Sequence, residues 1–129
     1  MFLGAPELAV DGIKCGGVYI FKITDSGKLK FLTKVFPSER VESMQFGLTL
    51  DSSGEFLYVG APTQPRHTEG TGKVYCFKIN DDLSVVEAKT LSPDDLINGE
   101  SFGNIINASK DILAIRAGGN SLYLFKKEL

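Results

Sequence analysis

The strongest constraint in this chain is an internal repeat with a fixed spacing. The Gly-Ala-Pro sequence at residues 4–6 returns at residues 60–62 (60 − 4 = 56). At the same offset, the apolar run 18–23 returns at 74–79 and the Phe-Gly pair 46–47 returns at 102–103. Three separate motifs that share one offset predict a stack of similar structural units, each about 56 residues long.

The repeat loses its spacing at one place only. Residues 121–126 match residues 73–78 at an offset of 48 (121 − 73 = 48), so the third copy lacks eight positions (56 − 48 = 8) between Ala117 and Ser121. Surface loops tolerate such length changes and strands do not, which predicts a loop here. The third copy also has Arg-Ala-Gly at 116–118 in place of Gly-Ala-Pro, so we expect this corner to be built differently.

Each unit is predicted to hold four short strands, which we name A to D. Strands rich in β-branched and aromatic residues, separated by Asp, Asn, Ser and Gly turns, are typical of blades in a β-propeller. The expected strands are A at 46–50 and 102–106, B at 56–59 and 112–115, C at 18–23, 74–79 and 122–126, and D at 29–35 and 85–91. Tight turns are expected at 51–54 and 107–110 between strands A and B.

Two further features concern the surroundings of these strands. The apolar residues of strand C fall on both faces, which a strand needs when its sheet lies between two neighbouring sheets. The connections from D to A, at 37–45 and 93–101, are each expected to hold one helical turn. In the second connection Ser92 would cap the turn, Pro93 fits its first position, and Asp94 and Asp95 suit its positive end.

Composition and charge exclude several classes of function. The 129 residues carry 14 Lys and Arg against 16 Asp and Glu, and the basic residues stand singly apart from Lys126-Lys127, which leaves no basic footprint for nucleic acid. No apolar run is long enough for membrane insertion, and the charges and apolar residues near residue 1 lead us to expect no signal peptide in this chain. Cys76 stands where the other copies have Ile20 and Leu124, so we expect a small buried hydrophobe there, and Cys15 lies in a loop. The redox state of the two thiols stays open.

Patterns that carry catalysis or metal binding are weak. His67 is the single histidine, and no nucleophile elbow accompanies it. One His and two distant Cys do not make a zinc set, and the glycine-rich stretch 69–74 lacks the hydroxyl that a phosphate loop needs after its lysine. Adjacent acidic pairs at 81–82 and 94–95 are more typical of turns than of acid–base catalysis. We therefore expect no enzymatic activity, no cofactor and no metal.

The motifs resemble the FG-GAP repeat, the blade unit of the integrin α-subunit propeller. The resemblance is carried by FGLTLDSSGEFLYVGAP at 46–62 and GKVYCFKI at 72–79, and it covers the whole chain. It divides one structural domain into the later part of a first blade (1–45, strands B to D), a complete second blade (46–101) and a partial third (102–129, strands A to C). It implies an all-β propeller of four-stranded antiparallel blades, of which this chain holds about two and a half.

Calcium loops of integrin-type blades lie between strands A and B and carry several Asp or Asn residues. Here this turn keeps only Asp51 and Glu55 in the second copy, and only Asn107 and Asp111 in the third. Calcium prefers six or more oxygen ligands. The chain is therefore more similar to the metal-free FG-GAP variety of bacterial and viral proteins.

About two and a half blades do not close a ring, and open sheet edges invite pairing with other chains. We expect either a portion of a longer polypeptide or a ring completed by neighbouring subunits, with an independent monomer the least favoured state. The resemblance implies a role in adhesion, structural assembly or protein recognition, in a virion, a surface appendage or an extracellular protein. The sequence itself leaves the compartment and the partner open.

The long B-to-C and D-to-A connections are the expected recognition surface, because in FG-GAP propellers they share one face. The segments 7–15 and 63–71 have equal length but little common sequence, while the strands beside them repeat. The candidate ligand-binding residues are Gln64, Arg66, His67 and Glu69, with Asp11 and Lys14 beside them.

Two other functions stay open on the sequence. A lectin-like propeller would bind glycans in pockets between blades, which aromatic residues such as Tyr58 would have to reach. An enzyme would have to take most of its catalytic residues from other blades, and nothing in these residues supports it.

Overall fold

Strands and turns make up the whole of the part of the chain that the computed structural model describes, residues 1–62, 71–97 and 99–127. These ranges contain no helix, and therefore none long and apolar enough to cross a membrane. The strands form four sheets, and every pairing between named strands is antiparallel. The protein is all-β, as the sequence predicts.

The central sheet is a four-stranded meander in the order β6-β7-β8-β9. Its strands are Thr49–Ser53 (β6), Phe56–Ala61 (β7), Lys73–Ile79 (β8) and Val85–Leu91 (β9). Each strand lies beside its neighbour in the sequence, which is the predicted A-B-C-D order. The β6–β7 and β8–β9 connections are short, so closing them costs little chain entropy. A hydrogen bond from Asn80 N to Ser84 O (2.9 Å) closes the second of these turns.

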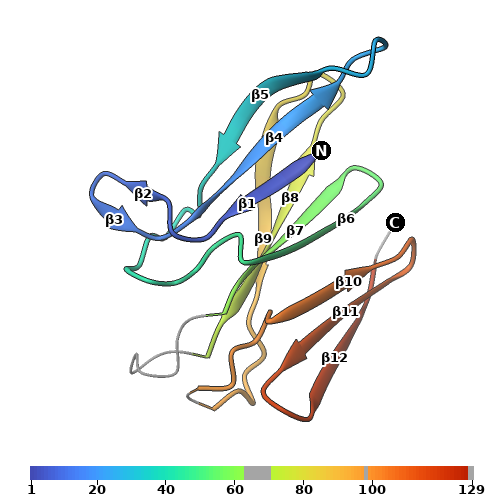
Figure 1. Cartoon of the computed structure of the whole chain (residues 1–129). Coiled ribbons are helices and arrows are strands. Elements are labelled where there is room, and N and C mark those ends of the chain that lie inside the picture. Colours follow the sequence, from blue (N-terminus) through green and yellow to red (C-terminus); the bar gives the residue numbers. More distant parts are fainter. Residues whose placement is uncertain (63–70, 98, 128–129) are drawn as a thin grey trace.

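Two three-stranded sheets flank the central one (Figure 1). The first, in the order β1-β4-β5, contains Phe2–Ala5 (β1), Gly17–Ile23 (β4) and Leu29–Val35 (β5). The third, in the order β10-β11-β12, contains Ile105–Ala108 (β10), Ile112–Ala117 (β11) and Ser121–Lys126 (β12). A two-stranded hairpin, Ala9–Val10 (β2) with Ile13–Lys14 (β3), projects from the first sheet.

Strand pairing in the first sheet is reproduced 56 residues later in the central one. Gly4 pairs with Val18, and Gly60 pairs with Val74. The ladder from β4 to β5 shifts register after Ile20, and the ladder from β8 to β9 shifts at the corresponding place, after Cys76. This β-bulge, which bends a strand and increases its twist, was not predicted from the sequence.

The core consists of two apolar layers, one on each side of the central sheet. The first layer lies between the first and central sheets and contains Val18, Phe46 and Tyr75. The second lies between the central and third sheets and contains Val74, Phe102 and Ile115. Because the central sheet contributes to both layers, β7 and β8 have buried residues on both faces. For β8 this confirms the prediction made for strand C.

Strand β12 differs from that prediction. Its residues Leu122 and Leu124 are 64% and 65% exposed, whereas Val74 and Cys76, which take the equivalent places in β8, are 0% and 1% exposed. Within the described residues no sheet covers the outer face of the third sheet. The apolar pattern is therefore present on both faces of β12, but only one face is buried.

The Phe-Gly pairs join successive sheets. The backbone N–H of Phe46 donates to the Cys15 carbonyl (2.9 Å), and that of Phe102 donates to the Thr71 carbonyl (2.8 Å). The Phe46 ring packs edge-on against Tyr75 at a centroid distance of 5.3 Å, within the range that aromatic pairs prefer. Each pair therefore binds the preceding sheet through its backbone and its own sheet through its ring.

Two glycines make this contact sterically possible. Gly16 and Gly72 have φ values of 95° and 83°, a region that residues with a Cβ rarely adopt. A Cβ at either position would also overlap the carbonyl oxygen of the phenylalanine, Phe46 or Phe102, in the next sheet. Glycine is therefore required here both for the backbone conformation and for the close approach of two chains.

The predicted turns between strands A and B are too long. Asp51 pairs with Tyr58 and Ser53 pairs with Phe56, so residues 51–53 belong to β6, and only Gly54 and Glu55 turn the chain. In the third sheet β10 likewise runs on to Ala108. Strand A also begins later than predicted, at Thr49 and Ile105, because the residues after each Phe-Gly pair form the corner between sheets.

The predicted helical turns in the D-to-A connections are wrong for the described residues. After Pro93 the chain makes a single turn at Asp94 and Asp95, closed by a hydrogen bond from Leu96 N to Pro93 O (3.3 Å). One such turn does not nucleate a helix, because several dihedral angles must be ordered for each hydrogen bond gained.

The corner of the third sheet agrees with its predicted shortening. β11 ends at Ala117 and β12 begins at Ser121, so the deleted positions fall in the turn between them. Arg116 supports this turn by donating from Nη2 to the Gly119 carbonyl (3.1 Å). The backbone N–H of Gly118 also donates to the Glu100 carbonyl.

Candidate functional site

Of the six predicted ligand-binding residues, four lie outside the described residues: Gln64, Arg66, His67 and Glu69. Asp11 and Lys14 are described, and both belong to the hairpin of β2 and β3. Asp11 occupies its turn with φ of 51°, a conformation that Asp tolerates better than most residues.

The hairpin contacts the D-to-A connection of the first sheet. Asp11 Oδ2 lies 3.0 Å from Arg40 Nη1, and the backbone N–H of Lys14 donates to Glu42 Oε2 (2.9 Å). The side chain of Asp11 is 85% exposed, and such a pair contributes about 1 kcal/mol or less. The structure thus adds Arg40 and Glu42 to this surface. The only signal for them in the sequence was the expected adjacency of the two connections.

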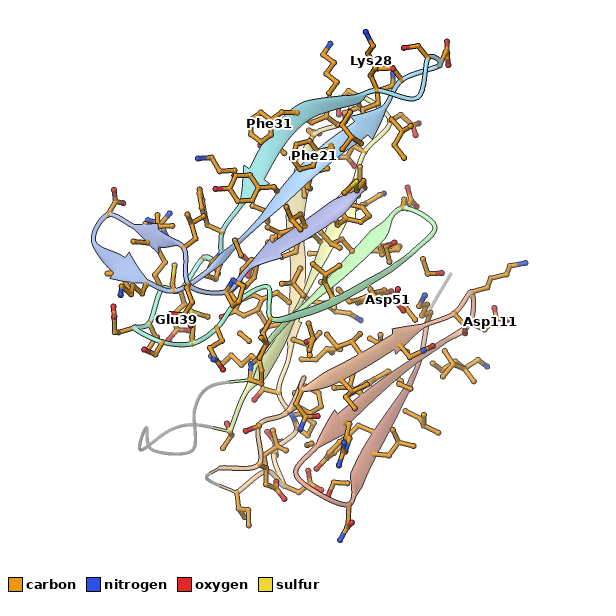
Figure 2. The ribbon with its side chains drawn as sticks, viewed as in Figure 1. Phe21, Lys28, Phe31, Glu39, Asp51 and Asp111 are labelled. Carbon is orange, nitrogen blue, oxygen red and sulfur yellow. The ribbon has the colours of Figure 1, made fainter. Side chains whose placement is uncertain are left out.

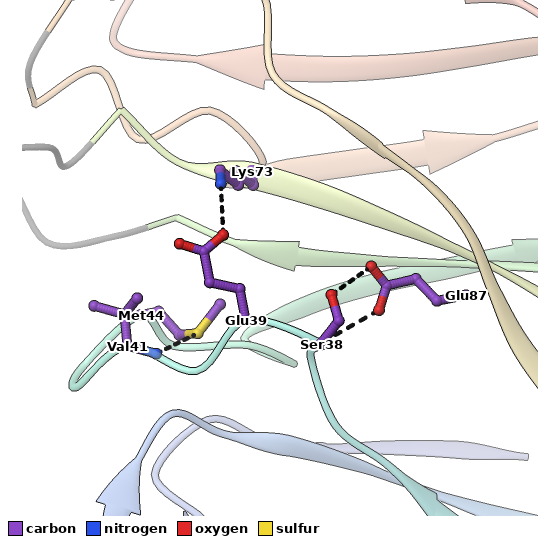
Figure 3. Close-up of polar contacts among 6 residues, drawn as sticks. All are labelled: Ser38, Glu39, Val41, Met44, Lys73 and Glu87. Carbon is purple, nitrogen blue, oxygen red and sulfur yellow. Dashed lines mark hydrogen bonds and ion pairs between the residues drawn. The ribbon is translucent and has the colours of Figure 1, made fainter.

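The same connection is attached to the central sheet by polar contacts (Figure 3). Glu39 Oε2 pairs with Lys73 Nζ at 3.2 Å. Ser38 donates to both carboxylate oxygens of Glu87, from its hydroxyl at 2.8 Å and from its backbone N–H at 3.2 Å. These contacts hold the loop across the junction of two sheets, and their geometry is that of a structural support.

A cavity of about 660 Å³ lies between the central and third sheets at their outer strands. Its apolar lining includes Tyr58, Leu91, Leu113 and Phe125. Four lysines and one glutamate complete the polar part of the lining: Lys89, Lys110, Lys126, Lys127 and Glu55. The sequence predicted that Tyr58 would have to reach a pocket between blades for a glycan to bind, and the structure places it in this lining.

The Tyr58 ring already has two neighbours. It stacks with Phe56 at a centroid distance of 6.5 Å, and Lys127 Nζ lies 5.1 Å from its centroid. Burial raises the pKa of the Tyr58 hydroxyl, with a smaller contribution from Cys76. At neutral pH the phenol is therefore protonated and acts as a neutral polar group in an apolar wall.

A second cavity of about 480 Å³ lies where the inner strands of all three sheets meet. Its lining includes Gly4, Thr49 and Asn104. Among the described residues, Asn104 Oδ1 is a buried side-chain oxygen without a hydrogen-bond partner. Leaving such an acceptor unsatisfied costs about 1–3 kcal/mol, so this oxygen is a local cost to stability.

Neither thiol is built for nucleophilic chemistry. Cys15 and Cys76 are free and are 0% and 1% exposed. Burial raises the pKa of the Cys76 thiol to about 11 and raises the pKa of Cys15 as well. The reactive form of cysteine is the thiolate, so both residues act as buried apolar groups at neutral pH, as predicted for Cys76.

Asp51, which the sequence places in the turn after strand A but which lies in β6, has a structural role. Its Oδ2 accepts a hydrogen bond from Ala108 N in the third sheet (2.7 Å), and its Oδ1 accepts one from Ser52 N (2.9 Å). Figure 2 shows Asp51 between the two sheets and Asp111 at the far turn of the third. In the described ranges no three His, Cys, Asp or Glu side chains gather as metal ligands.

Comparison with known proteins adds no family to these observations. Neither a family model nor a curated protein matches this chain. The assignment of function therefore depends on the geometry described above.

Proposed function

We propose that this chain is a non-enzymatic recognition or assembly module built from β-propeller blades of the FG-GAP kind. Three observations support the proposal. The central sheet has four strands in sequential order, the first sheet pairs its strands in the same register, and the Phe-Gly contact between sheets recurs after 56 residues. A repeated scaffold of this kind presents binding surfaces without supplying catalytic groups of its own.

The observation that carries the proposal is the exposure of apolar side chains on the two outer faces of the three stacked sheets, the outer face of the first sheet and that of the third. On the third sheet Leu122 and Leu124 are about two-thirds exposed. On the first sheet Phe31 is 50% exposed and lies beside Phe21 at a ring distance of 5.9 Å (Figure 2). Contiguous apolar patches on a folded protein mark surfaces that contact other proteins.

Comparison with the central sheet shows what these faces resemble. Leu3 is 51% exposed, whereas Val59, its equivalent 56 residues later, is fully buried against the first sheet. The outer faces therefore have the composition of surfaces that are buried elsewhere in the same chain. A protein surface of complementary shape is the partner that this composition favours.

The experiment is a native mass measurement with circular dichroism on the same sample, over a range of concentrations. We expect a β-rich spectrum and a discrete association that weakens at least tenfold in Leu122→Lys, because a charge would be buried in the contact. Ile97→Lys is the matched control, since Ile97 is 68% exposed but lies in a loop. A folded monomer at every concentration, with no affinity for other proteins, would contradict the proposal.

A glycan-binding propeller is the second candidate, and the position of Tyr58 in the outer cavity favours it. A glycan array separates the two functions. Binding of a neutral glycan that is lost in Tyr58→Leu, with an unchanged circular dichroism spectrum, would support the lectin. Association with proteins alone would support recognition or assembly.

A further inference from the structure

Strand β12 is an edge strand in the described part of the chain. It pairs with β11 through all six of its residues, and the third sheet ends there. Its counterparts β4 and β8 each pair on that side with one more strand, β5 and β9. The outward N–H and C=O groups of an edge strand are free to pair with an added chain.

This edge lacks the features that usually protect one. β12 contains no proline, and its ladder with β11 has no register shift. Lys126, at its end, is its one charged residue. Proteins commonly protect edges with bulges, prolines or charges in mid-strand. The strand is therefore regular and open to pairing along most of its length.

The cavity beside this edge is larger than its counterpart. The equivalent outer cleft, between the first and central sheets, measures about 390 Å³ and is lined in part by β9 residues such as Val85 and Glu87. The cleft beside β12 measures about 660 Å³. A strand added to β12 would project side chains into this space, as β9 does in the smaller cleft.

The charge of the cavity defines what those side chains would be. Among the described residues four lysines line it against one carboxylate, that of Glu55, so this part of the lining is positively charged. Its apolar walls include Leu91 and Leu113. Acidic side chains that alternate with apolar ones would satisfy both parts of the lining.

The register of the central sheet indicates where an acidic side chain would lie. In that sheet Phe77 pairs with Glu87, whose carboxylate crosses to the first sheet and accepts two hydrogen bonds from Ser38. Phe125 is the equivalent of Phe77, since it follows Leu124 as Phe77 follows Cys76. A glutamate opposite Phe125 would therefore point toward the central sheet, where Lys89 lines the cavity.

We propose that β12 and this cavity form a docking site for an extended acidic and apolar segment of another protein, which adds to the third sheet as an antiparallel fourth strand. The inference rests on the proposed recognition function and names the partner's chemistry. A glycan fits the site less well, because the Tyr58 ring on which a sugar would stack is already in contact with Phe56 and Lys127.

The test uses a synthetic, end-capped peptide in which Val and Glu alternate, as long as β9 at seven residues. We expect saturable binding by calorimetry, together with slower amide hydrogen exchange along β12. A peptide of the same length in which Val and Lys alternate should bind at least tenfold more weakly, because it meets four lysines.

Two variants separate strand pairing from simple charge attraction. N-methylation of alternate residues in the peptide keeps its charges but removes ladder hydrogen bonds, and should weaken binding about tenfold or more. In the protein, Lys89→Glu should weaken binding of the acidic peptide, whereas Lys22→Glu, an equal change of charge on the first sheet, should not.

Three outcomes would overturn the inference: no binding of the acidic peptide, binding that N-methylation leaves unchanged, or a heparin tetrasaccharide that binds more tightly than the peptide through the same residues. The native mass experiment with Leu122→Lys is independent of these measurements. If the wild-type chain associates and Leu122→Lys weakens that association while the peptide fails to bind, recognition stands and this docking site falls.

Discussion

The carboxylate of Asp51 accepts a hydrogen bond of 2.7 Å from the backbone N–H of Ala108, which joins the central sheet to the third. The two residues are 57 positions apart and belong to the first strand of each sheet. The Asp51 side chain therefore completes the backbone hydrogen bonding of the neighbouring sheet.

Removal of this carboxylate should destabilise the junction of the two sheets. Asp51→Ala is expected to lower the free energy of unfolding by about 1.5–3 kcal/mol, the range for hydrogen bonds to charged groups. Asp111→Ala is the control, because Asp111 is exposed at a turn, and it should change stability by less than about 0.5 kcal/mol. Urea denaturation followed by circular dichroism measures both; equal effects would show that the Asp51 contact is not stabilising.

Alanine at Gly16 should be poorly tolerated. The expected loss exceeds the roughly 1–2 kcal/mol of a left-handed conformation alone, because the new methyl group would also overlap the Phe46 carbonyl oxygen. Gly27→Ala isolates the conformational part, since Gly27 has a φ of 80° but open space around it. If the two variants have the same thermal midpoint, the close approach at Gly16 does not contribute to the free energy of unfolding.

The packing of Phe46 between the first and central sheets is expected to contribute strongly to stability. Phe46 is fully buried against Tyr75 and Phe77, so Phe46→Ala should cost about 3–5 kcal/mol. Phe31→Ala is the matched control, because Phe31 is half exposed and should lose much less. Denaturant midpoints and the slope of each transition would distinguish lost packing from a change in cooperativity. A Phe31 effect as large as that of Phe46 would contradict this assignment.

Stability should decline in alkaline solution. Burial raises the pKa of Cys76 from 9.0 to about 11 and the pKa of Tyr75 from 10.0 to about 12. Both groups are neutral when protonated, so the unfolded chain loses its protons first as the pH rises. The stabilisation is complete below about pH 9 and is lost progressively as the pH rises toward 11 and 12.

Urea midpoints at pH 8 and pH 10 measure this loss. Cys76→Val removes one titrating group while keeping a small apolar side chain, and Tyr75→Phe removes the other. Each variant should reduce the difference between the two midpoints. A wild-type midpoint that does not fall between these pH values would contradict the expected deprotonation of the unfolded chain.

The sequence was most informative where structure is local. The predicted D strands at 29–35 and 85–91 coincide with β5 and β9, because short polar turns precede strand-length segments in which apolar and polar residues mix. The turn after strand A was predicted too long, since Asp51 and Ser53 are turn formers by type but pair with Tyr58 and Phe56 across the ladder. Cross-strand pairing thus outweighed local preference at these positions.

The candidate site was less predictable. Asp11 and Lys14 follow from the length and variability of their loop, but their contacts with Arg40 and Glu42 cross about 28 residues of sequence. The cavity lined by Lys89, Lys110 and Tyr58 brings together residues from separate sheets that no spacing relates. Contacts of this kind arise from the packing of sheets, which a residue pattern does not encode locally.

The sequence by itself predicted the order of the strands within the central sheet and the place of most of them, because turn residues and strand-forming residues act locally, but it did not predict the β2–β3 hairpin. Only the tertiary structure decided which faces are covered. Leu124 and Cys76 occupy equivalent places in β12 and β8, yet one is exposed and the other is buried. Burial is a property of the space between sheets, and the same apolar residue becomes core or docking surface according to whether a neighbouring sheet occupies that space.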